Sequence, residues 1–353
     1  MLFNSWQVGV FVSAILGGLC WLVLQRFRSN APTITNNTNA SVDFAKLLMQ
    51  ILVIGIHTEP FGFNFWLDKL FGIITRLCVP FFFVTSGYCF WRSHKSPKEF
   101  LKRIVTLYVV WSVIYLPMDI ARLGKMTVPQ LLTLFLWDGN NHALWYLCGT
   151  IIGFIITCVL LKFLKPKQVF ILSVLFLVIG TVKSTYSTAM SQLFGINLSD
   201  YLGSRNGLFY GFPYLSLGML IATSDKKGIV KERKGLYIGF ATSIILLAVE
   251  SYLLVIHFKT SSTILWLSVL PYTYYFFEIV LNTHIQLNKS LSLTIRKVST
   301  LMYVSHSLFI PVLAMFLSDM MLFVLVVFVA GIFSLVVIKL SEIKQISFLK
   351  CLY

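Results

Sequence analysis

The sequence predicts an all-α integral membrane protein, folded as a multi-span helical bundle of about eleven transmembrane helices. Three observations support this fold class. Of the 353 residues, 57 % are hydrophobic and only 12 % are charged, whereas soluble domains carry about a quarter charged residues. Apolar runs long enough to cross a bilayer, about 20 residues each, recur along the chain. The Lys and Arg residues fall mainly in the short gaps between these runs, as in cytoplasmic loops.

The predicted spans are, in order, 7–25, 43–60, 67–90, 104–118, 143–163, 168–186, 206–223, 235–256, 263–283, 299–317 and 320–339. The first run differs from a cleavable signal peptide because its basic residues, Arg26 and Arg28, follow it. We therefore expect four parts: an N-terminal transmembrane anchor over 1–30, a polar linker over 31–41, a ten-span core over 42–340 and a cytoplasmic tail over 341–353.

The gaps between spans alternate in charge, and this alternation predicts the orientation. The basic gaps are Arg92–Arg103, Lys162–Lys167, Lys226–Lys234, Lys289–Lys297 and the tail after Lys339. The gaps with little positive charge are Thr58–Trp66, Asp119–Asn141, Lys183–Arg205, His257–Ser262 and Ser318–Asp319. Because cytoplasmic loops carry the excess of Lys and Arg, the first set is predicted to be cytoplasmic and the second external. The expected location is a bacterial cytoplasmic membrane, with the N-terminus outside and the C-terminus inside.

Charge and cysteine content exclude some classes of function. The net charge of +16 would suit a nucleic-acid-binding protein, but it is spread over gaps that flank apolar runs, so we expect the lipid bilayer and no nucleic acid as a partner. The six cysteines form no CxxC pair and no cluster with histidine. Neither a disulfide framework nor a metal site is expected.

The run DFAKLLMQILVIGIHTEP, residues 43–60, carries ionisable residues inside a predicted span. Such residues are costly in lipid and are therefore candidates for function. Lys46 and His57 lie eleven positions apart, so they share one helix face to within about 20° and are separated by a rise of roughly 16 Å. Asp43 lies one turn before Lys46 and can pair with it. The structural alternatives are a lysine that snorkels to the interface and a histidine that only packs.

The next span places Arg76 a few turns from the outer surface, where a cation must be paired or face a cavity. Pro80 and Gly87 interrupt this span, which is tolerated where a helix lines protein or water. The densest basic cluster follows on the predicted cytoplasmic side and suits a polyphosphate or an anionic lipid. Its members are Arg92, Lys95, Lys98, Lys102 and Arg103. The alternative is that these charges only fix topology.

These motifs resemble the acyltransferase-3 family of integral membrane acyltransferases. The family pattern of an arginine, ten residues and a histidine is represented here by Lys46 and His57, and RLCVPFFFVTSGYCF at 76–90 resembles its R-x-x-VP-FF-x-x-SG pattern. Supporting matches are KEFLKRIVTLYVVW at 98–111, HALWYL at 142–147, FPYLSLGMLI at 212–221 and STLMYVSHSLF at 299–309. The resemblance covers about residues 42–340. Lysine at 46 keeps the positive charge but lacks the bidentate fork of arginine.

The resemblance implies transfer of an acyl group, with acetyl as the first expectation, from cytoplasmic acyl-CoA to a hydroxyl of an envelope polysaccharide or sugar. His57 would be the general base, since a hydroxyl nucleophile needs such help. Arg76 would keep the imidazole neutral and stabilise an oxyanion. Glu59 would orient the acceptor, or be a solvated rim carboxylate. Lys46 and the basic cluster would bind the donor, acyl-CoA, which is a substrate and not a resident cofactor.

Two rival functions remain open from the sequence. One is a membrane transporter of a small molecule such as serine, because related membrane domains occur fused to amino-acid racemases and resemble an uptake module. The other is a flippase or polysaccharide-export component with no chemistry. The residues do not indicate which acceptor or which acyl group is used, nor whether transfer is direct or proceeds through an acyl-histidine intermediate. The oligomeric state is not readable from the residues either.

Overall fold

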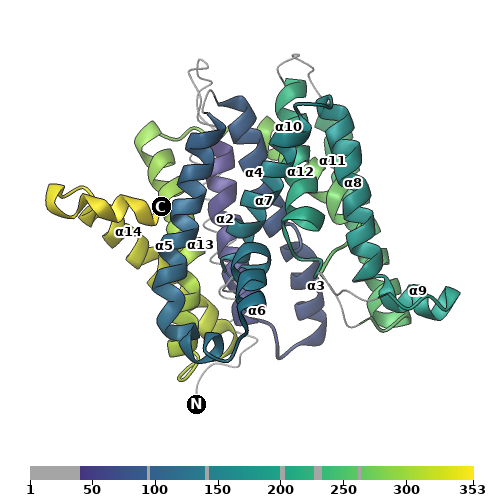
Figure 1. Cartoon of the computed structure of the whole chain (residues 1–353), viewed down its shortest axis with the longest axis horizontal. Coiled ribbons are helices and arrows are strands. Elements are labelled where there is room, and N and C mark those ends of the chain that lie inside the picture. The colour runs from purple at the N-terminus through teal and green to yellow at the C-terminus, as the bar shows by residue number, and fades with distance from the viewer. Residues whose placement is uncertain (1–39, 94–95, 140–142, 199–202, 226–232, 261–263) are drawn as a thin grey trace. The chain divides into compact units, whose positions relative to one another are not determined.

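The computed structural model describes residues 40–93, 96–139, 143–198, 203–225, 233–260 and 264–353, and this part of the chain is helical with no strand (Figure 1). Its α-helices are α2 (Ala40–Thr58), α3 (Phe65–Thr75), α4 (Cys78–Arg92), α5 (Pro97–Leu123), α6 (Val128–Thr133), α7 (Trp145–Leu160), α8 (Pro166–Lys183), α9 (Ser187–Phe194), α10 (Phe212–Asp225), α11 (Arg233–Ser251), α12 (Val269–Asn282), α13 (Lys289–Leu313) and α14 (Asp319–Leu340). Three π-helical segments, η1 (Leu134–Asp138), η2 (Gly207–Gly211) and η3 (Tyr252–His257), and a 3₁₀ helix, η4 (Lys344–Leu352), complete the list. The predicted anchor 7–25 lies outside the described residues.

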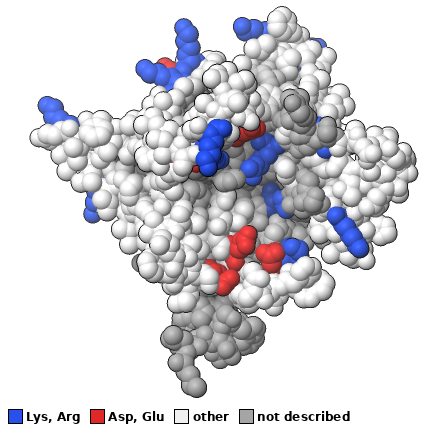
Figure 2. All heavy atoms as spheres, turned by 60° about the horizontal axis from the view of Figure 1, so that its bottom comes forward, with Lys and Arg blue, Asp and Glu red and all other residues white. Residues whose placement is uncertain are grey.

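The helices and the surface are those of a multi-pass membrane protein. Six helical stretches within the described ranges are long and apolar enough to cross a bilayer: Ala40–Thr58, Phe65–Arg92, Pro97–Leu123, Pro166–Lys183, Arg233–His257 and Asp319–Leu340. Large apolar side chains such as Phe163, Ile245 and Phe328 are exposed on α-helices or next to them. Figure 2 shows one face on which most of the surface carries no charged side chain. A surface of this kind suits contact with lipid.

Helix bounds differ from the predicted spans in two places. The expected span 67–90 consists of two helices, α3 and α4, separated at Arg76 and Leu77. The break precedes Pro80 because proline is tolerated in the first turn of a helix, where its missing N–H costs no hydrogen bond. The external gap Asp119–Asn141 is largely helical: α5 runs on to Leu123, and α6 and η1 follow.

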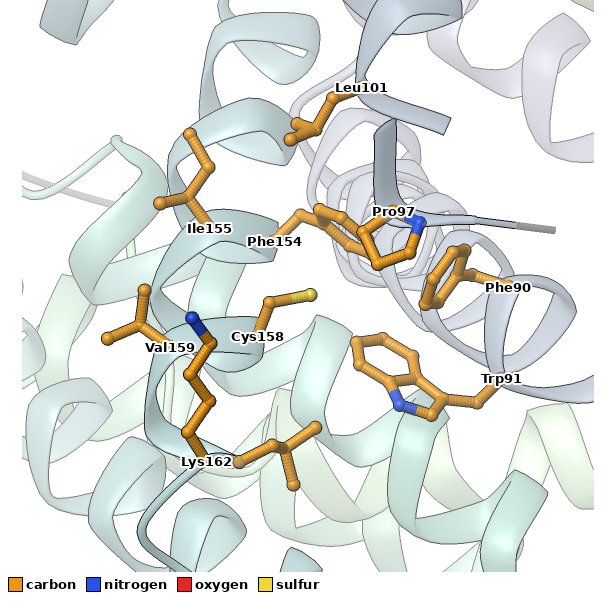
Figure 3. Close-up of a pocket in the computed structure, with 10 residues that line it drawn as sticks. Phe90, Trp91, Pro97, Leu101, Phe154, Ile155, Cys158, Val159 and Lys162 are labelled. Carbon is orange, nitrogen blue, oxygen red and sulfur yellow. The ribbon is translucent and has the colours of Figure 1, made fainter. Parts of the chain in front are cut away.

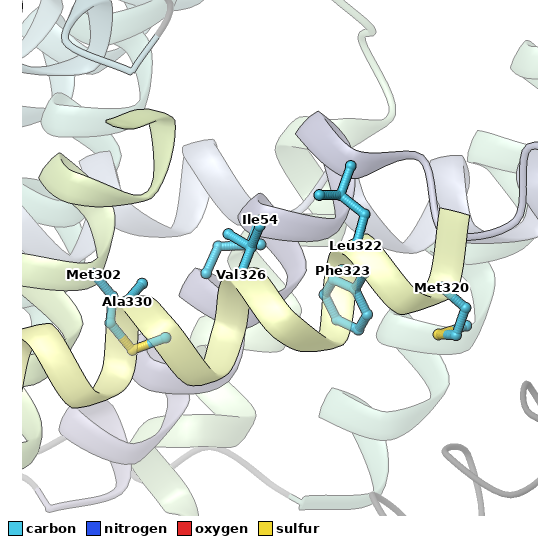
Figure 4. Close-up of a cluster of buried hydrophobic side chains, with 7 residues drawn as sticks. All are labelled: Ile54, Met302, Met320, Leu322, Phe323, Val326 and Ala330. Carbon is cyan, nitrogen blue, oxygen red and sulfur yellow. The ribbon is translucent and has the colours of Figure 1, made fainter. Parts of the chain in front are cut away.

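The chain forms two compact units, which are described separately. Unit 1 comprises Met1–Gly72 and Thr283–Lys339, and unit 2 comprises Ile73–Asn282 and Leu340–Tyr353. In unit 1, the described helices α2, α13 and α14 share an apolar cluster (Figure 4). Its buried members are Ile54, Met302, Met320, Leu322, Phe323, Val326 and Ala330. The start of α2 is held by Ser41, whose hydroxyl donates to the carbonyl of Thr283 and accepts from the N–H of Ile285 at 3.1 Å.

Unit 2 is organised by the close approach of α4 and α10, which pack along each other through two glycines. A Cβ atom on Gly87 would lie 2.3 Å from the carbonyl oxygen of Leu215, and a Cβ on Gly218 would lie 2.1 Å from that of Val84. Small residues let helix backbones approach closely where lipid gives no hydrophobic drive for helix association. The backbones of α4 and α10 therefore touch almost directly, and α7, α8 and α12 pack around them.

A buried carboxylate in unit 2 fixes the segment before α12. Glu250 accepts hydrogen bonds from the hydroxyl of Tyr186 at 2.6 Å, the N–H of Leu267 at 2.8 Å and the N–H of Ser268 at 2.9 Å. The hydroxyl of Ser268 donates to the same carboxylate. Because a buried carboxylate is tolerated only when its acceptor sites are filled, Glu250 has a structural role in this unit.

The α4–α10 contact gives a stability prediction. Gly218→Ala places a methyl group against the backbone of α4, so we expect it to destabilise the protein by about 1–3 kcal/mol or more. Gly331→Ala is the matched control, because nothing lies within 4 Å of its added Cβ and alanine favours a helix over glycine by up to about 1 kcal/mol. Thermal unfolding of the purified variants in detergent measures both. Equal stability of the two variants would show that the helices do not approach this closely.

Candidate functional site

Two helices of unit 1 carry polar residues at matching seven-residue intervals. Seven residues turn a helix by about 700°, which returns to within about 20° of the same face. Each stripe therefore follows one side of its helix. The stripe on α2 is Asp43, Gln50 and His57, and the stripe on α13 is Ser292, Ser299 and His306. Contacts at both ends of the stripes show that they face each other and that α2 and α13 run in the same direction. We call this pair of stripes the polar seam.

The first end of the polar seam is a buried ion pair. Asp43 is 2 % exposed, and its two carboxylate oxygens accept from Arg296 Nε at 2.9 Å and Arg296 Nη2 at 2.8 Å. Ser292 donates a further hydrogen bond at 2.7 Å to the same carboxylate. This bidentate geometry is the strong form of a carboxylate–guanidinium pair. The sequence pointed to Lys46 as a possible partner of Asp43; the structure adds Arg296 and Ser292 of α13 as partners of this carboxylate.

The other end of the polar seam holds two imidazoles. The ring centroids of His57 and His306 lie 5.3 Å apart. His57 is exposed, whereas His306 is fully buried. Nδ1 of His306 faces the carbonyl oxygens of Tyr303 at 2.7 Å and Met302 at 3.1 Å. Since both are acceptors, Nδ1 is the nitrogen that carries the proton in the neutral ring, and Nε2 then presents its lone pair. Among the described residues this Nε2 has no hydrogen-bond partner.

Two further predicted site residues, Lys46 and Glu59, also belong to unit 1. Lys46 lies on α2 between Asp43 and Gln50 and is half-buried. Glu59 is the first residue after α2; it is exposed and has a φ of 47°. A non-glycine residue rarely adopts a positive φ, and it does so mostly at turns, helix ends and functional sites. The chain therefore turns at Glu59, directly after the end of α2.

Arg76 belongs to unit 2 and lies at the break between α3 and α4. It is half-buried, and its guanidinium lies 5.4 Å from the centroid of the Trp266 ring. A cation over an indole face is stabilised by the ring quadrupole, more so when it is desolvated. The structure thus gives the Arg76 cation an aromatic contact, while its catalytic role stays a prediction.

Unit 2 contains an apolar pocket of about 480 Å³, and three of the predicted donor-binding cations are next in the chain to residues that line it. In Figure 3, Phe90 and Trp91 of α4 face Cys158 and Val159 of α7 across this pocket. The remaining lining residues are Pro97, Leu101, Phe154, Ile155, Leu161 and Lys162. Arg92, Lys98 and Lys102 each follow a lining residue directly in the chain, and all three are exposed, as is Arg103. Lys95 lies outside the described residues.

Sequence reasoning missed Arg296 and Ser292 as partners of Asp43 and gave His306 little weight. The signal was present in the spacing, since Ser292, Ser299 and His306 repeat every seven residues. This spacing became interpretable only once α13 was known to lie beside α2. Asp43 and Ser292 are 249 residues apart in the chain, so no pattern within one stretch of sequence indicates that they pair.

The buried ion pair gives a second stability prediction. Arg296→Ala leaves the Asp43 carboxylate buried without its counter-charge, so we expect a loss of roughly 2–4 kcal/mol. This value is reduced because the Arg296 side chain is 34 % exposed and therefore partly screened. Lys289→Ala, an exposed cation at the start of the same helix, should change little. Adding Asp43→Asn to Arg296→Ala should cost less than the sum of the two single changes in thermal unfolding, and strict additivity would rule out the coupling.

Comparisons of this chain with known proteins identify its family. A family described as an acyltransferase domain matches residues 39–340. A curated "Amino-acid racemase" of Enterococcus faecalis is 27 % identical over 209 residues, which is 54 % of this chain and 29 % of that protein. A "Serine/alanine racemase" of Enterococcus gallinarum is 26 % identical over 233 residues, 60 % of this chain and 33 % of that protein.

The chain thus spans only about a third of the length of these curated relatives, and no solved structure matches it. The family match, in contrast, runs from the first residues of α2 to the end of α14, and so includes the polar seam, the α3–α4 break and the basic cluster. The chain belongs to the acyltransferase-3 family.

Proposed function

We propose that the protein is a membrane O-acyltransferase that moves an acyl group, acetyl in the first instance, from cytoplasmic acyl-CoA to a hydroxyl of an extracytoplasmic envelope glycan. The observation that carries this proposal is the exposed imidazole of His57 at the end of α2, beside His306, in a chain of the acyltransferase-3 family. The proposal includes eleven spans in a bacterial cytoplasmic membrane, with the N-terminus outside and the C-terminus inside, as the loop charges predict.

His57 serves as general base in this reaction. The imidazole takes the proton of the acceptor hydroxyl while the hydroxyl oxygen attacks the thioester carbonyl carbon. The new C–O bond forms, the C–S bond breaks, and the proton passes to the departing CoA sulfur. Arg76 is proposed to stabilise the negative charge that develops on the carbonyl oxygen, and Glu59 to orient the acceptor sugar. These two roles rest on the sequence pattern.

The donor nucleotide is proposed to bind at the basic cluster of unit 2. Arg92, Lys98, Lys102 and Arg103 are exposed cations suited to the phosphates of CoA. The neighbouring pocket presents Phe90 and Trp91, whose aromatic faces suit an adenine ring. An aromatic pocket whose lining residues are followed in the chain by exposed cations supports a nucleotide site over a purely topological role for the charges.

A second candidate function is transport of a small amino acid such as serine. The observation that favours it is the similarity of part of this chain to two proteins named as racemases, one of them a serine/alanine racemase. A chain with this function would move the amino acid and would not cleave a thioester.

The acyltransferase proposal predicts the effect of removing the base. Purified protein given acetyl-CoA labelled in its acetyl group should release or transfer the label, and His57→Ala should lower this rate by about 10²- to 10⁴-fold, as expected for loss of a general base. His57→Ala removes an exposed ring, so its unfolding temperature should stay close to that of the parent.

The same protein in liposomes is then tested for uptake of labelled serine. Uptake of serine, with no turnover of any acyl-CoA, would establish the transporter and exclude the acyltransferase. Thioester turnover that is unaffected by His57→Ala would retain the acyltransferase but assign the base to another residue.

The basic cluster gives a separate prediction about the donor. The triple change of Lys98, Lys102 and Arg103 to Ala should weaken binding of CoA by about tenfold or more, since each exposed charged contact is worth up to about 1 kcal/mol. Changing Lys165 and Lys167 to Ala removes exposed cations of another basic gap and should leave CoA affinity unchanged. Equal effects of the two sets, measured by titration calorimetry, would show that the cluster acts only as a topology signal.

A further inference from the structure

The middle of the polar seam contains two buried polar side chains with unused hydrogen-bonding capacity. Gln50 is fully buried and Ser299 is 1 % exposed. Within the described part of the chain, Nε2 and Oε1 of Gln50 and Oγ of Ser299 have no hydrogen-bond partner. Both residues lie midway along their stripes, seven positions after Asp43 or Ser292 and seven before His57 or His306.

The orientation of Gln50 follows from its neighbours on the stripe. Asp43 and His57, one heptad before and after it, both contact α13. Because these three positions share one helix face to within about 40°, Gln50 also points toward the α13 side, where Ser299 lies. The seam thus has a bonded layer at one end, an imidazole layer at the other and an unbonded amide–hydroxyl layer between them.

Such a layer needs an explanation, because buried polar groups are nearly always hydrogen-bonded. An apolar residue at position 50 would avoid the desolvation cost of an unbonded amide. A buried glutamine at this position is accounted for when a bound ligand completes the hydrogen bonds of its side-chain amide. A side-chain amide offers one donor edge and one acceptor edge, which is the complement of a secondary amide.

We propose that Gln50, assisted by Ser299, binds the pantetheine arm of the acyl-CoA donor, at the amide that lies farther from the sulfur. This inference rests on the proposed function and adds a specificity-determining residue to it. Gln50 lies seven residues before His57, a rise of roughly 10 Å along the helix. Eight covalent bonds separate the acyl carbon of the donor from the nitrogen of that amide, and an extended chain of eight bonds also spans about 10 Å. When the farther amide of the pantetheine arm is hydrogen-bonded to Gln50, the acyl carbon of the donor reaches the level of His57 along α2.

The test compares two donors that differ at the amide in question. Acetyl-pantetheine carries both amides of the arm, whereas S-acetyl-N-acetylcysteamine carries only the amide nearer the sulfur. Gln50→Leu should lower kcat/KM for acetyl-pantetheine and for acetyl-CoA by roughly ten- to a hundredfold, the usual effect of losing a buried hydrogen-bond partner. The ratio of kcat/KM between the two short donors should fall by the same factor. Ser299→Ala should shift this ratio in the same direction but less.

Met49→Leu is the matched control, because Met49 is a buried apolar neighbour on the same helix and leucine conserves its volume. It should leave the donor ratio unchanged. Gln50→Leu removes an unbonded amide, so the unliganded variant should unfold at the same temperature as the parent or higher.

Loss of activity toward both short donors alike, or no change in the ratio, would overturn the inference and assign Gln50 the role of a polar residue that fixes helix register. An unmodified protein that turns over no thioester would refute the proposed function itself, and the inference with it. These two failures are distinguishable because the second is seen without any substitution.

Discussion

The register between α2 and α13 is the constraint on which the rest of unit 1 depends. It is set where Asp43 meets Arg296 and Ser292. A guanidinium fork and a serine hydroxyl fill the acceptor sites of a carboxylate only in one relative position of the two helices. Given that position, the seven-residue repeat brings Gln50 level with Ser299 and His57 level with His306. The apolar cluster around Ile54 and Met302 closes the same pair of helices against α14.

The two units solve the problem of helix association by different physical means. Lipid tails are as apolar as leucine, so burial alone gives little drive for helices to pair in a bilayer. Unit 1 uses a polar seam, in which charge pairing and imidazole contact select the partner. Unit 2 uses glycine: Gly87 and Gly218 let the backbones of α4 and α10 meet. A glycine contact of this kind is insensitive to protonation, whereas the seam contains groups that can bind protons, the two imidazoles and a carboxylate. The general base that we propose, His57, lies in the polar unit.

Much of the architecture was readable from the sequence because it depends on local properties. Apolar run length located helices at each predicted span that the structure describes, and the Pro80 region marked a broken span, although the break falls at Arg76 and Leu77. The spacing of Lys46 and His57 predicted that they lie on one helix, and both lie on α2. The partners on α13 were not predicted, because pairing between distant segments leaves no local signal. The helices within the gap Asp119–Asn141 were also missed, since its charged residues suggested an external loop. One contact that holds this segment, the hydrogen bond from the hydroxyl of Tyr108 to the carbonyl of Phe135, is non-local.

The matched repeats of the seam have a consequence for how this chain can change in evolution. Inserting or deleting one residue between Asp43 and His57 would rotate everything beyond that point by about 100° relative to α13. The imidazole of His57 would then no longer face that of His306, even if every amino acid of the site were retained. Substitutions along α2 can accumulate one at a time, but changes in its length cannot. Homologues that share the seam should therefore vary in loop length and hold the number of residues between these two positions fixed.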